Sequence, residues 1–262
     1  MSEPLVLRAD EGAIAILTMN APSRLNALSN AMIAALSAAF DSIATDDSVR
    51  VVILRGAGRA FCAGHDLREM QAARDAADGG EAAFAKLFAE CAAMMQRIVA
   101  LPQPVIAQVQ GIATAAGCQL AASCDMVVAA EDARFGVNGV NIGLFCTTPM
   151  VALTRKVAPA VAFELLTTGE FLPAPRAREL GLVNRTAPAE GLDEATLTLA
   201  RTIAAKLPAA IRLGKAAFTA QRGLDLATAY ERAGQVMVQN LMRADTEEGL
   251  RAFIEKRPPV WT

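Results

Sequence analysis

Two short runs of small residues, at 61–67 and 111–120, have the composition and the setting to do chemistry. Each follows a strongly apolar segment, at 51–55 and 105–109, and each leads into a helical pattern. Small side chains let a ligand lie directly against backbone N–H groups. The start of a helix adds unpaired donors with partial positive charge. If the two loops meet, they form an oxyanion hole; the alternative is a pair of tight turns without a ligand.

Strands and helices that could position these loops alternate along the first half of the chain. Ser29 can cap a helix that runs to about Ala44. The apolar stripe of that helix consists of Met32, Leu36 and Phe40. Further strands are expected at 13–19, 51–55, 105–109 and 126–129, and a longer helix at 82–101. Such alternation favours an α/β fold with parallel pairing through right-handed crossovers.

The chain is almost wholly helical in pattern after about Thr147, with a short extended exception at 181–184. The break near 188–191 predicts a domain boundary, with a core at 1–190 and a helical segment at 191–262. The final helices are expected at 193–206, 209–221, 224–242 and 246–256.

Composition excludes several classes of function. Lys and Arg number 25 against 27 Asp and Glu, without a block of like charges, which argues against nucleic acid and anionic membranes as partners. Five cysteines without C-x-x-C spacing and a single histidine disfavour a disulfide framework and a metal site. The start at 1–4 is acidic and lacks a basic region, and no apolar run would span a bilayer. We therefore expect a cytoplasmic protein with reduced, buried thiols.

Four ordered blocks, at 24–28, 59–70, 110–125 and 248–257, resemble the crotonase (enoyl-CoA hydratase/isomerase) superfamily across essentially the whole chain. The resemblance implies an α/β crotonase spiral of β-β-α turns with a C-terminal helical oligomerisation segment. It also implies an acyl-CoA substrate, with coenzyme A as part of the substrate thioester and no separate cofactor. Members usually form trimers or dimers of trimers, so we expect a homotrimer or hexamer.

The resemblance assigns two oxyanion donors, the backbone N–H groups of His65 and Ala116. They are expected to bind the thioester carbonyl oxygen and to stabilise the enolate. Phe253 and Lys256 lie three apart on the last helix, a face that in relatives closes over the adenine, often of a neighbouring subunit. The implied coenzyme A contacts are Arg24, Leu25, Ala27, Ala63, Asp66, Leu67, Arg68, Phe253 and Lys256. The alternatives are solvated arginines at 24 and 68, and core packing at 253.

Two departures from the family pattern concern the chemistry itself. Typical hydratases carry two glutamates that activate water and deliver a proton; Gln119 and Gly139 stand at those positions. An amide can hydrogen-bond but cannot exchange a proton at neutral pH. Because general acid–base assistance contributes roughly 10²–10⁴ per group, hydration of an enoyl-CoA is expected to be slow.

Few residues could take over the proton transfers. His65 titrates near neutrality if unperturbed, but its side chain could equally pack beneath the ligand or hold Asp66. Asn138, Asn141 and Cys146 are expected to wall the acyl pocket. A nucleophilic role for Cys146 lacks an evident base nearby.

The pattern is most similar to a divergent subgroup, the enoyl-CoA hydratase domain-containing proteins. That subgroup is nominally assigned hydratase activity. The step from Gly64 to Asp66 also occurs in acyl-CoA decarboxylases of the methylmalonyl type. Loss of CO₂ yields an enolate directly, so a site without paired carboxylates suits decarboxylation. A non-catalytic acyl-CoA-binding protein remains the alternative from another class.

Overall fold

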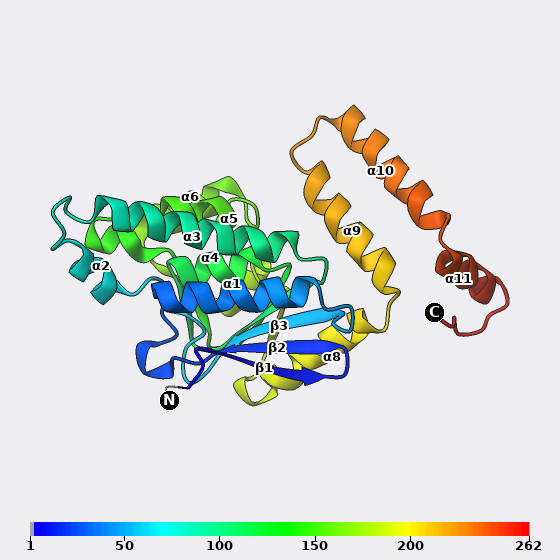
Figure 1. Ribbon diagram of the computed structural model, residues 1–262, viewed down its shortest axis with the longest axis horizontal. Coiled ribbons are helices and arrows are strands. Elements are labelled where there is room, and N and C mark those ends of the chain that lie inside the picture. Colours follow the sequence, from blue (N-terminus) through cyan, green and yellow to red (C-terminus); the bar gives the residue numbers. More distant parts are fainter. Residues whose placement is uncertain (1–2, 262) are drawn as a thin grey trace.

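A computed structural model describes residues 3–261 (Figure 1). Its main layer is a six-stranded sheet with the order β1-β2-β3-β4-β6-β9. β1 pairs antiparallel with β2, and every later pair in this sheet is parallel, starting with Ile14 opposite Val51. These strands are β1 Val6–Glu11, β2 Ile14–Met19, β3 Val51–Gly56, β4 Val105–Val109, β6 Met126–Ala130 and β9 Arg185–Ala187. The α/β class and the parallel sheet expected from the sequence are confirmed.

A second sheet of three short strands turns the chain into a spiral. Its order is β5-β7-β8, formed by Ile112–Thr114, Arg134–Gly136 and Phe171–Pro173. β4 leads directly into β5 and then into helix α4, and β6 leads into β7, so successive turns contribute a strand to each sheet. The loops between the two sheets therefore gather at one edge of the spiral.

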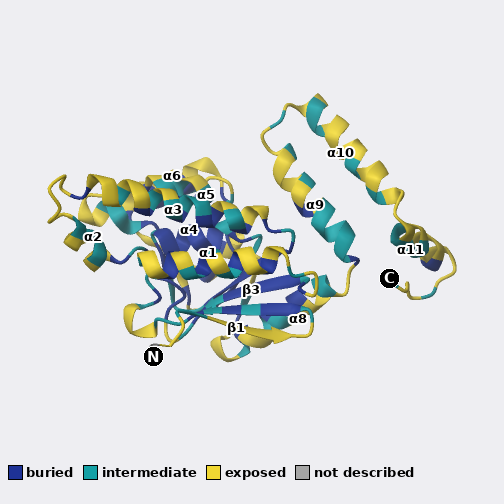
Figure 2. Ribbon diagram, in the orientation of Figure 1, coloured by how far each residue is buried: buried dark blue, intermediate teal, exposed yellow. Residues whose placement is uncertain are grey.

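Helices cover both faces of the main sheet (Figure 1). α1 and α3 pack together on one face, and α8 lies against β2, β3, β4, β6 and β9 on the other. α4 lies deep in the molecule, with seven of its eight residues buried (Figure 2). The helices of this body are α1 Asn30–Ala44, α2 Leu67–Ala73, α3 Glu81–Ala100, α4 Ala116–Ser123, α5 Thr147–Leu153, α6 Pro159–Thr168, α7 Ala174–Glu179 and α8 Leu192–Ala204, with 3-10 turns η1 Pro22–Arg24, η2 Asn138–Ile142 and η3 Ala189–Gly191.

The predicted cap and stripe of α1 are confirmed. The Ser29 hydroxyl accepts the N–H of Met32 at 3.1 Å, which satisfies one of the free donors of the first turn. Met32, Leu36 and Phe40 are buried together in the core. The spacing of these side chains thus fixes which face of α1 meets the sheet.

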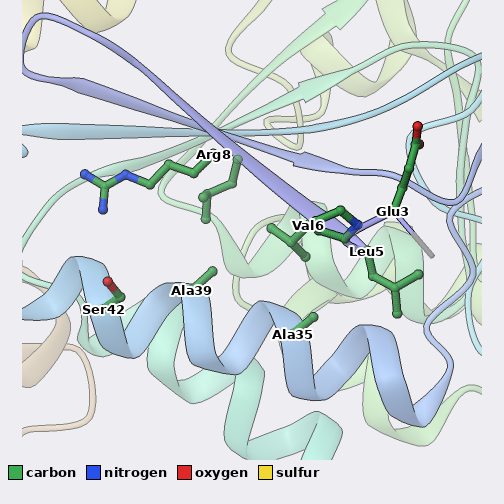
Figure 3. A pocket seen from close by; sticks show the side chains of 9 residues that line it. Glu3, Leu5, Val6, Arg8, Ala35, Ala39 and Ser42 are labelled. Atoms are coloured by element: carbon green, nitrogen blue, oxygen red, sulfur yellow. The ribbon is translucent and has the colours of Figure 1, made fainter. Parts of the chain in front are cut away.

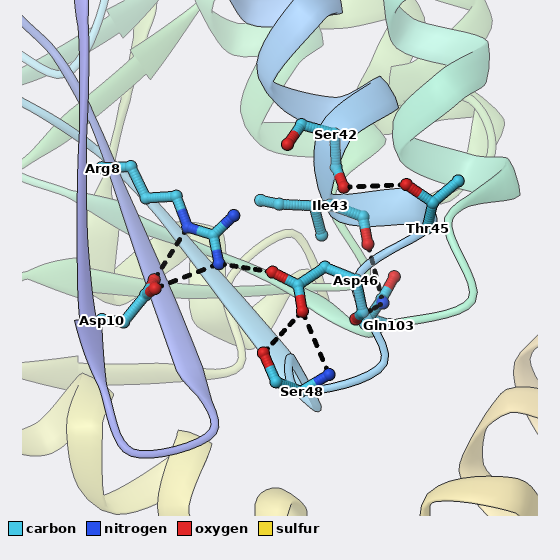
Figure 4. A network of polar contacts seen from close by, with 8 residues as sticks. All are labelled: Arg8, Asp10, Ser42, Ile43, Thr45, Asp46, Ser48 and Gln103. Atoms are coloured by element: carbon cyan, nitrogen blue, oxygen red, sulfur yellow. Dashed lines mark hydrogen bonds and ion pairs between the residues drawn. The ribbon is translucent and has the colours of Figure 1, made fainter.

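A polar network ties the first hairpin to the end of α1 (Figure 4). Arg8 on β1 donates to Asp10 at 2.9 Å and to Asp46 at 2.7 Å. Hydrogen bonds from Ser48 and Arg8 lower the pKa of Asp46 to about 2. The buried Gln103 amide donates to the carbonyl of Ile43 at 3.0 Å, so the turn before β4 is joined to the same corner.

The last three helices form an arm that stands away from the body (Figure 1). α9 and α10 pack against each other, and α11 follows at the far end. The arm consists of α9 Pro208–Gln221, α10 Leu226–Leu241 and α11 Ala244–Ile254. Figure 2 shows that it is largely exposed, and none of the residues that the structure describes in α10 is buried. α8 packs on the main sheet, so the arm begins only after it, at Pro208. The predicted domain boundary between residues 190 and 191 stays a prediction.

The structure also differs from the sequence-based expectations. The extended segment expected at 181–184 is wrong: Gly181, with φ +87°, lies in the turn after α7, and the strand is Arg185–Ala187. β1 was not predicted because five of its six residues are exposed, so it lacks an alternating apolar face. β5, β7 and β8 have three residues each, which is too short for a period to show. Across residues 3–261, none of the helices is long and apolar enough to cross a bilayer.

Candidate active site at the start of helix α4

Residues 24–28 are held against residues 63–66 by main-chain hydrogen bonds. The N–H of Ala63 donates to Leu25 O at 3.0 Å, and the N–H of Leu28 donates to Gly64 O at 2.7 Å. The buried Asn26 side chain also links the two segments, because its amide donates to the Ala60 carbonyl at 2.8 Å. The first predicted block therefore positions the loop that carries His65.

The loop at 61–67 meets the start of α4 at two glycines. Gly117 has no room for a side chain, because an added Cβ would collide with the Cys62 carbonyl oxygen. Gly64 has φ +91°, and an added Cβ would lie 3.0 Å from Ala115 Cβ and 3.4 Å from Ala116 N. Only glycine combines this conformation with so close an approach. The two loops that the sequence singled out therefore meet at this point.

Two backbone donors at this meeting point are free. Among residues 3–261, neither the N–H of His65 nor that of Ala116 has an acceptor. Ala115, the N-cap residue directly before Ala116, has φ 49° and ψ −120°, a conformation that costs a non-glycine residue about 1–3 kcal/mol. Strain of this kind persists where the surroundings enforce it. The N-terminal end of α4 adds partial positive charge at Ala116, and the role of the two N–H groups as oxyanion donors stays a prediction.

The His65 ring is packed rather than exposed. Its Nδ1 lies 3.4 Å from the carbonyl oxygen of Leu28, and its ring meets that of Phe88 edge to face, with the centroids 5.6 Å apart. Burial lowers the pKa of His65, although the contact with the Leu28 carbonyl opposes the shift. The ring is therefore neutral at pH 7. Its Nε2 is buried without a hydrogen-bond partner among the described residues.

Gln119 lies one helical turn after Ala116, on the same face of α4. Its side chain is almost fully buried, with 5% of the residue exposed. Its Oε1 finds no partner within the described residues. Because buried polar atoms are usually hydrogen-bonded, we expect this oxygen to accept a hydrogen bond from water or from a ligand.

Gly139 lies in η2, where a turn of the chain fills the space beside it. An added Cβ would lie 2.5 Å from Leu144 O and 2.8 Å from Cys146 Sγ. The same turn is closed by the N–H of Leu144, which donates to Gly139 O at 2.9 Å. Burial raises the pKa of the Cys146 thiol, so a thiolate nucleophile is disfavoured there. Asn138 accepts a hydrogen bond from the Thr114 hydroxyl at 2.7 Å, and Asn141 is exposed.

Seven of the nine residues expected to contact coenzyme A are gathered around the two loops. Arg24 is half exposed and donates to the buried Asp66 carboxylate at 2.7 Å. Burial by itself raises the pKa of Asp66, but hydrogen bonds from the Arg68 N–H and from Arg24 outweigh it and hold the pKa below its usual range. The gathered set is Arg24, Leu25, Ala27, Ala63, Asp66, Leu67 and Arg68, of which Arg24, Leu67 and Arg68 are exposed.

Phe253 and Lys256 do not join this set within one chain. Phe253 lies on α11, at the end of the arm opposite the body, and is 84% exposed (Figure 1). Core packing, the alternative reading of Phe253, is therefore wrong for the isolated chain. The helix ends at Ile254 and Lys256 follows it with φ 57°, so the shared helical face expected for the two residues is wrong. Their contact with a neighbouring subunit's ligand stays a prediction.

The hollow in Figure 3 lies elsewhere, between β1 and α1. Its volume is about 490 Å³, and it is lined by Leu5, Val6 and Ala39 among others, but by none of the predicted site residues. A much smaller hollow of about 30 Å³ lies between α2 and α3, beside Leu28 and Asp66. No group of three potential metal ligands is found within residues 3–261.

The sequence did not single out Phe88 or the Leu144 carbonyl. Phe88 is one apolar residue among many on α3, so its contact with His65 has no signal in the pattern. A main-chain carbonyl is present at every residue, so its position can come only from the structure.

Comparisons with known proteins extend over the whole chain. A sequence model of the enoyl-CoA hydratase/isomerase family matches residues 9–262. The chain is 43% identical over 259 residues to enoyl-CoA hydratase domain-containing protein 3 of Xenopus laevis, covering 99% of this chain and 86% of that protein. An enoyl-CoA hydratase structure from Mycobacterium smegmatis superimposes with a TM-score of 0.95 at 51% identity, over 99% of both chains. The crystal structure of human enoyl-CoA hydratase domain-containing protein 3 superimposes with a TM-score of 0.93 at 41% identity, over 98% of this chain and 100% of that chain.

These likenesses confirm the crotonase spiral and the subgroup that the sequence resembles. They contradict the expected cytoplasmic location, because five relatives at 40% to 43% identity are named as mitochondrial proteins. That expectation was drawn from reduced, buried thiols. Free thiols indicate a reducing compartment and do not identify which one it is.

Proposed function

This chain belongs to the enoyl-CoA hydratase/isomerase family, and we propose that it binds acyl-CoA thioesters and stabilises their enolates. The observation that carries the proposal is the pair of backbone N–H groups at His65 and Ala116, which have no acceptor among residues 3–261. A thioester carbonyl oxygen placed between them would accept both hydrogen bonds. The orphaned amide of Gln119 and the free Nε2 of His65 would face the acyl group beside it.

The rate advantage of such a site comes from charge that develops on the thioester oxygen. One donor of an oxyanion hole is worth roughly 10²–10³ in rate. The α4 dipole adds to this stabilisation, because the N-terminal end of the helix faces the developing charge. The proposed site therefore favours reactions that pass through a thioester enolate.

The proposed site lacks the two carboxylates that transfer protons in typical hydratases. Gln119 can hold a water or a hydroxyl group but cannot take its proton. Gly139 has no side chain, and the Leu144 carbonyl beside it cannot act as a base. We therefore propose a hydratase-like acyl-CoA enzyme in which addition of water to an enoyl-CoA is slow, with the His65 side chain as the candidate for any proton transfer.

Decarboxylation of a malonyl-type thioester is the second candidate. The electrons of the C–C bond that breaks move into the thioester as CO₂ leaves, so the enolate forms without a base. The observation that favours it is the absence of a carboxyl group at positions 119 and 139. A non-catalytic acyl-CoA-binding protein is the remaining alternative.

One panel of substrates separates these functions. Pure protein is incubated with crotonyl-CoA, methylmalonyl-CoA and a saturated acyl-CoA, and the product masses are followed. Gain of water, loss of CO₂ or no change identifies hydratase, decarboxylase or binding protein in turn. Binding itself is tested by thermal unfolding: ligand at about 100 times its Kd adds about 2.7 kcal/mol of stability. A melting temperature that rises no more with acetyl-CoA than with adenine contradicts the whole proposal.

We further propose that the arm assembles the chain into a homotrimer or a hexamer. α10 presents apolar side chains to solvent, among them Tyr230 at 73% and Val238 at 60% exposure. Faces of this kind are typical of subunit interfaces. In such an assembly Phe253 and Lys256 of one subunit would reach the coenzyme A of another.

A further inference from the structure

Lys215 is the one buried residue among the described residues of α9. Its ammonium group enters the body and donates three hydrogen bonds: to Asp125 Oδ2 at 2.7 Å, to Gln103 O at 3.0 Å and to Ile98 O at 3.1 Å. All three donors of the group are therefore used, and its side chain is 7% exposed. A buried charge with full partners fixes the place where the arm meets the body.

The acceptor Asp125 stands directly at the end of α4. Its carboxylate also accepts the N–H of Val105 at 2.7 Å, which ties it to the start of β4. The preceding residue, Cys124, is the C-cap of α4. Lys156 donates to the carbonyl of Cys124 at 2.8 Å and to that of Asp125 at 3.0 Å. Two lysine ammonium groups thus hold the C-terminal end of α4, one from the body and one from the arm.

α4 connects these lysine contacts at its C-terminal end with the proposed oxyanion hole at its N-terminal end. At 1.5 Å per residue the helix is about 12 Å long, and Ala116 begins it at the opposite end. Seven of its eight residues are buried, so the helix cannot bend independently of its packing. A shift of the C-terminal end therefore moves the N–H of Ala116 relative to that of His65. Cations at the C-terminus also complement the helix dipole that points at the thioester.

We propose that Lys215 is a positioning residue that couples the arm to the oxyanion hole through Asp125 and α4. The inference rests on the proposed function, since it concerns the donor at Ala116. It assigns the arm a second role besides assembly: the arm supplies a charge that holds the catalytic helix in place.

The test compares variants of the full chain. Lys215→Met removes the ammonium group and leaves the partly buried Asp125 carboxylate without its charged partner. The double variant Lys215→Met, Asp125→Asn removes both charges, and the asparagine carbonyl still accepts from Val105. Arg212→Met is the matched control, because Arg212 on α9 also anchors the arm, to Asp47 at 2.7 Å, but does not touch α4.

The readout is the absorption of bound dimethylaminocinnamoyl-CoA, a conjugated thioester whose band moves to longer wavelength when its carbonyl is polarised. Affinity for the same probe and oligomeric state by light scattering are measured beside it. We expect the double variant to lose at least about half of the red shift, with Kd within about threefold of wild type and assembly unchanged. Arg212→Met should keep the full red shift.

Three results overturn the inference: an unchanged red shift in the double variant, an equal loss in Arg212→Met, or a loss that occurs only together with disassembly. The last would mean that Lys215 acts through the neighbouring subunits rather than through α4. Wild-type protein that binds the probe without any red shift instead contradicts the proposed oxyanion hole. The two failures are therefore distinguishable.

Discussion

The carbonyl oxygen of Leu144 lies where the side chain of residue 139 would begin, 2.5 Å from a Cβ added to Gly139. The position of the second family glutamate is therefore not simply vacant: the chain's own turn at 143–146 fills it. A carboxylate cannot be restored there without moving that turn. At position 119, by contrast, glutamine and glutamate have nearly the same shape.

Gln119→Glu should raise the hydration of crotonyl-CoA, whereas adding Gly139→Glu should not raise it further. A carboxylate at 119 can take the proton of the attacking water, for a gain of about 10²-fold or more. The measurement is the steady-state hydration rate of wild type, Gln119→Glu and the double variant. Gly139→Ala is the control for the clash, with a loss of about 1–3 kcal/mol in unfolding free energy. A wild-type turnover number already typical of an efficient hydratase would contradict this prediction.

Ala115→Gly should stabilise the protein by about 1 kcal/mol and keep its affinity for acyl-CoA. Ala115 has φ 49° and ψ −120°, which glycine adopts without strain. Ala121→Gly is the matched control on the same helix, where the conformation is helical, and it should destabilise the protein by about 1 kcal/mol. Urea unfolding of the three proteins gives both values. Destabilisation by Ala115→Gly would mean that the strain at this residue is not released by glycine.

Arg24→Met should weaken acyl-CoA binding by about fivefold, equivalent to about 1 kcal/mol. Acyl-pantetheine, which lacks the phosphates, should bind the variant and wild type alike. Arg97→Met is the control, because Arg97 also makes an ion pair with an aspartate, Asp41 at 2.8 Å, but away from the two loops. Isothermal titration of both ligands provides the Kd values. Equal weakening for both ligands would remove Arg24 from the phosphate site.

The Asp66 carboxylate should stabilise the fold above about pH 4 and lose this effect at lower pH. Its pKa is lower in the folded chain than in the unfolded chain, so the unfolded state binds the proton more readily as the pH falls. The stability difference between wild type and Asp66→Asn should therefore shrink as the pH drops through the folded pKa. Urea unfolding at a series of pH values measures it. A difference that stays constant down to pH 2 would contradict the assigned hydrogen bonds.

Val238→Glu should dissociate the assembly, because it places a charge on the exposed apolar face of α10. Light scattering should give a trimer or hexamer for wild type and a smaller species for the variant. Gln239→Glu on the same helix is the control, because it adds the same charge about 100° further round the helix, outside the apolar face. A monomeric wild-type protein at micromolar concentration would refute the assembly.

Local signals in the sequence were sufficient for much of the fold. The cap at Ser29 and the strand β4 at 105–109 were predicted at their observed places. The ordered blocks also located Gln119 and Gly139. The features that could not be predicted depend on contacts made only in the folded chain. The Leu144 carbonyl approaches Gly139 because the chain turns between them. Lys215 has the sequence context of an ordinary exposed lysine, and it is buried only because α9 packs on the body.

The two N–H groups of the proposed hole belong to different turns of the spiral, joined through the pairing of β3 with β4. Neither turn alone presents both donors, so the hole exists only when the strands have found their native register. We expect contacts of this sequence separation to form late in folding, because closing the loop between them costs entropy before they are made. A thioester held by both donors therefore stabilises the finished fold and no partly folded precursor, and the ligand should slow unfolding without speeding folding.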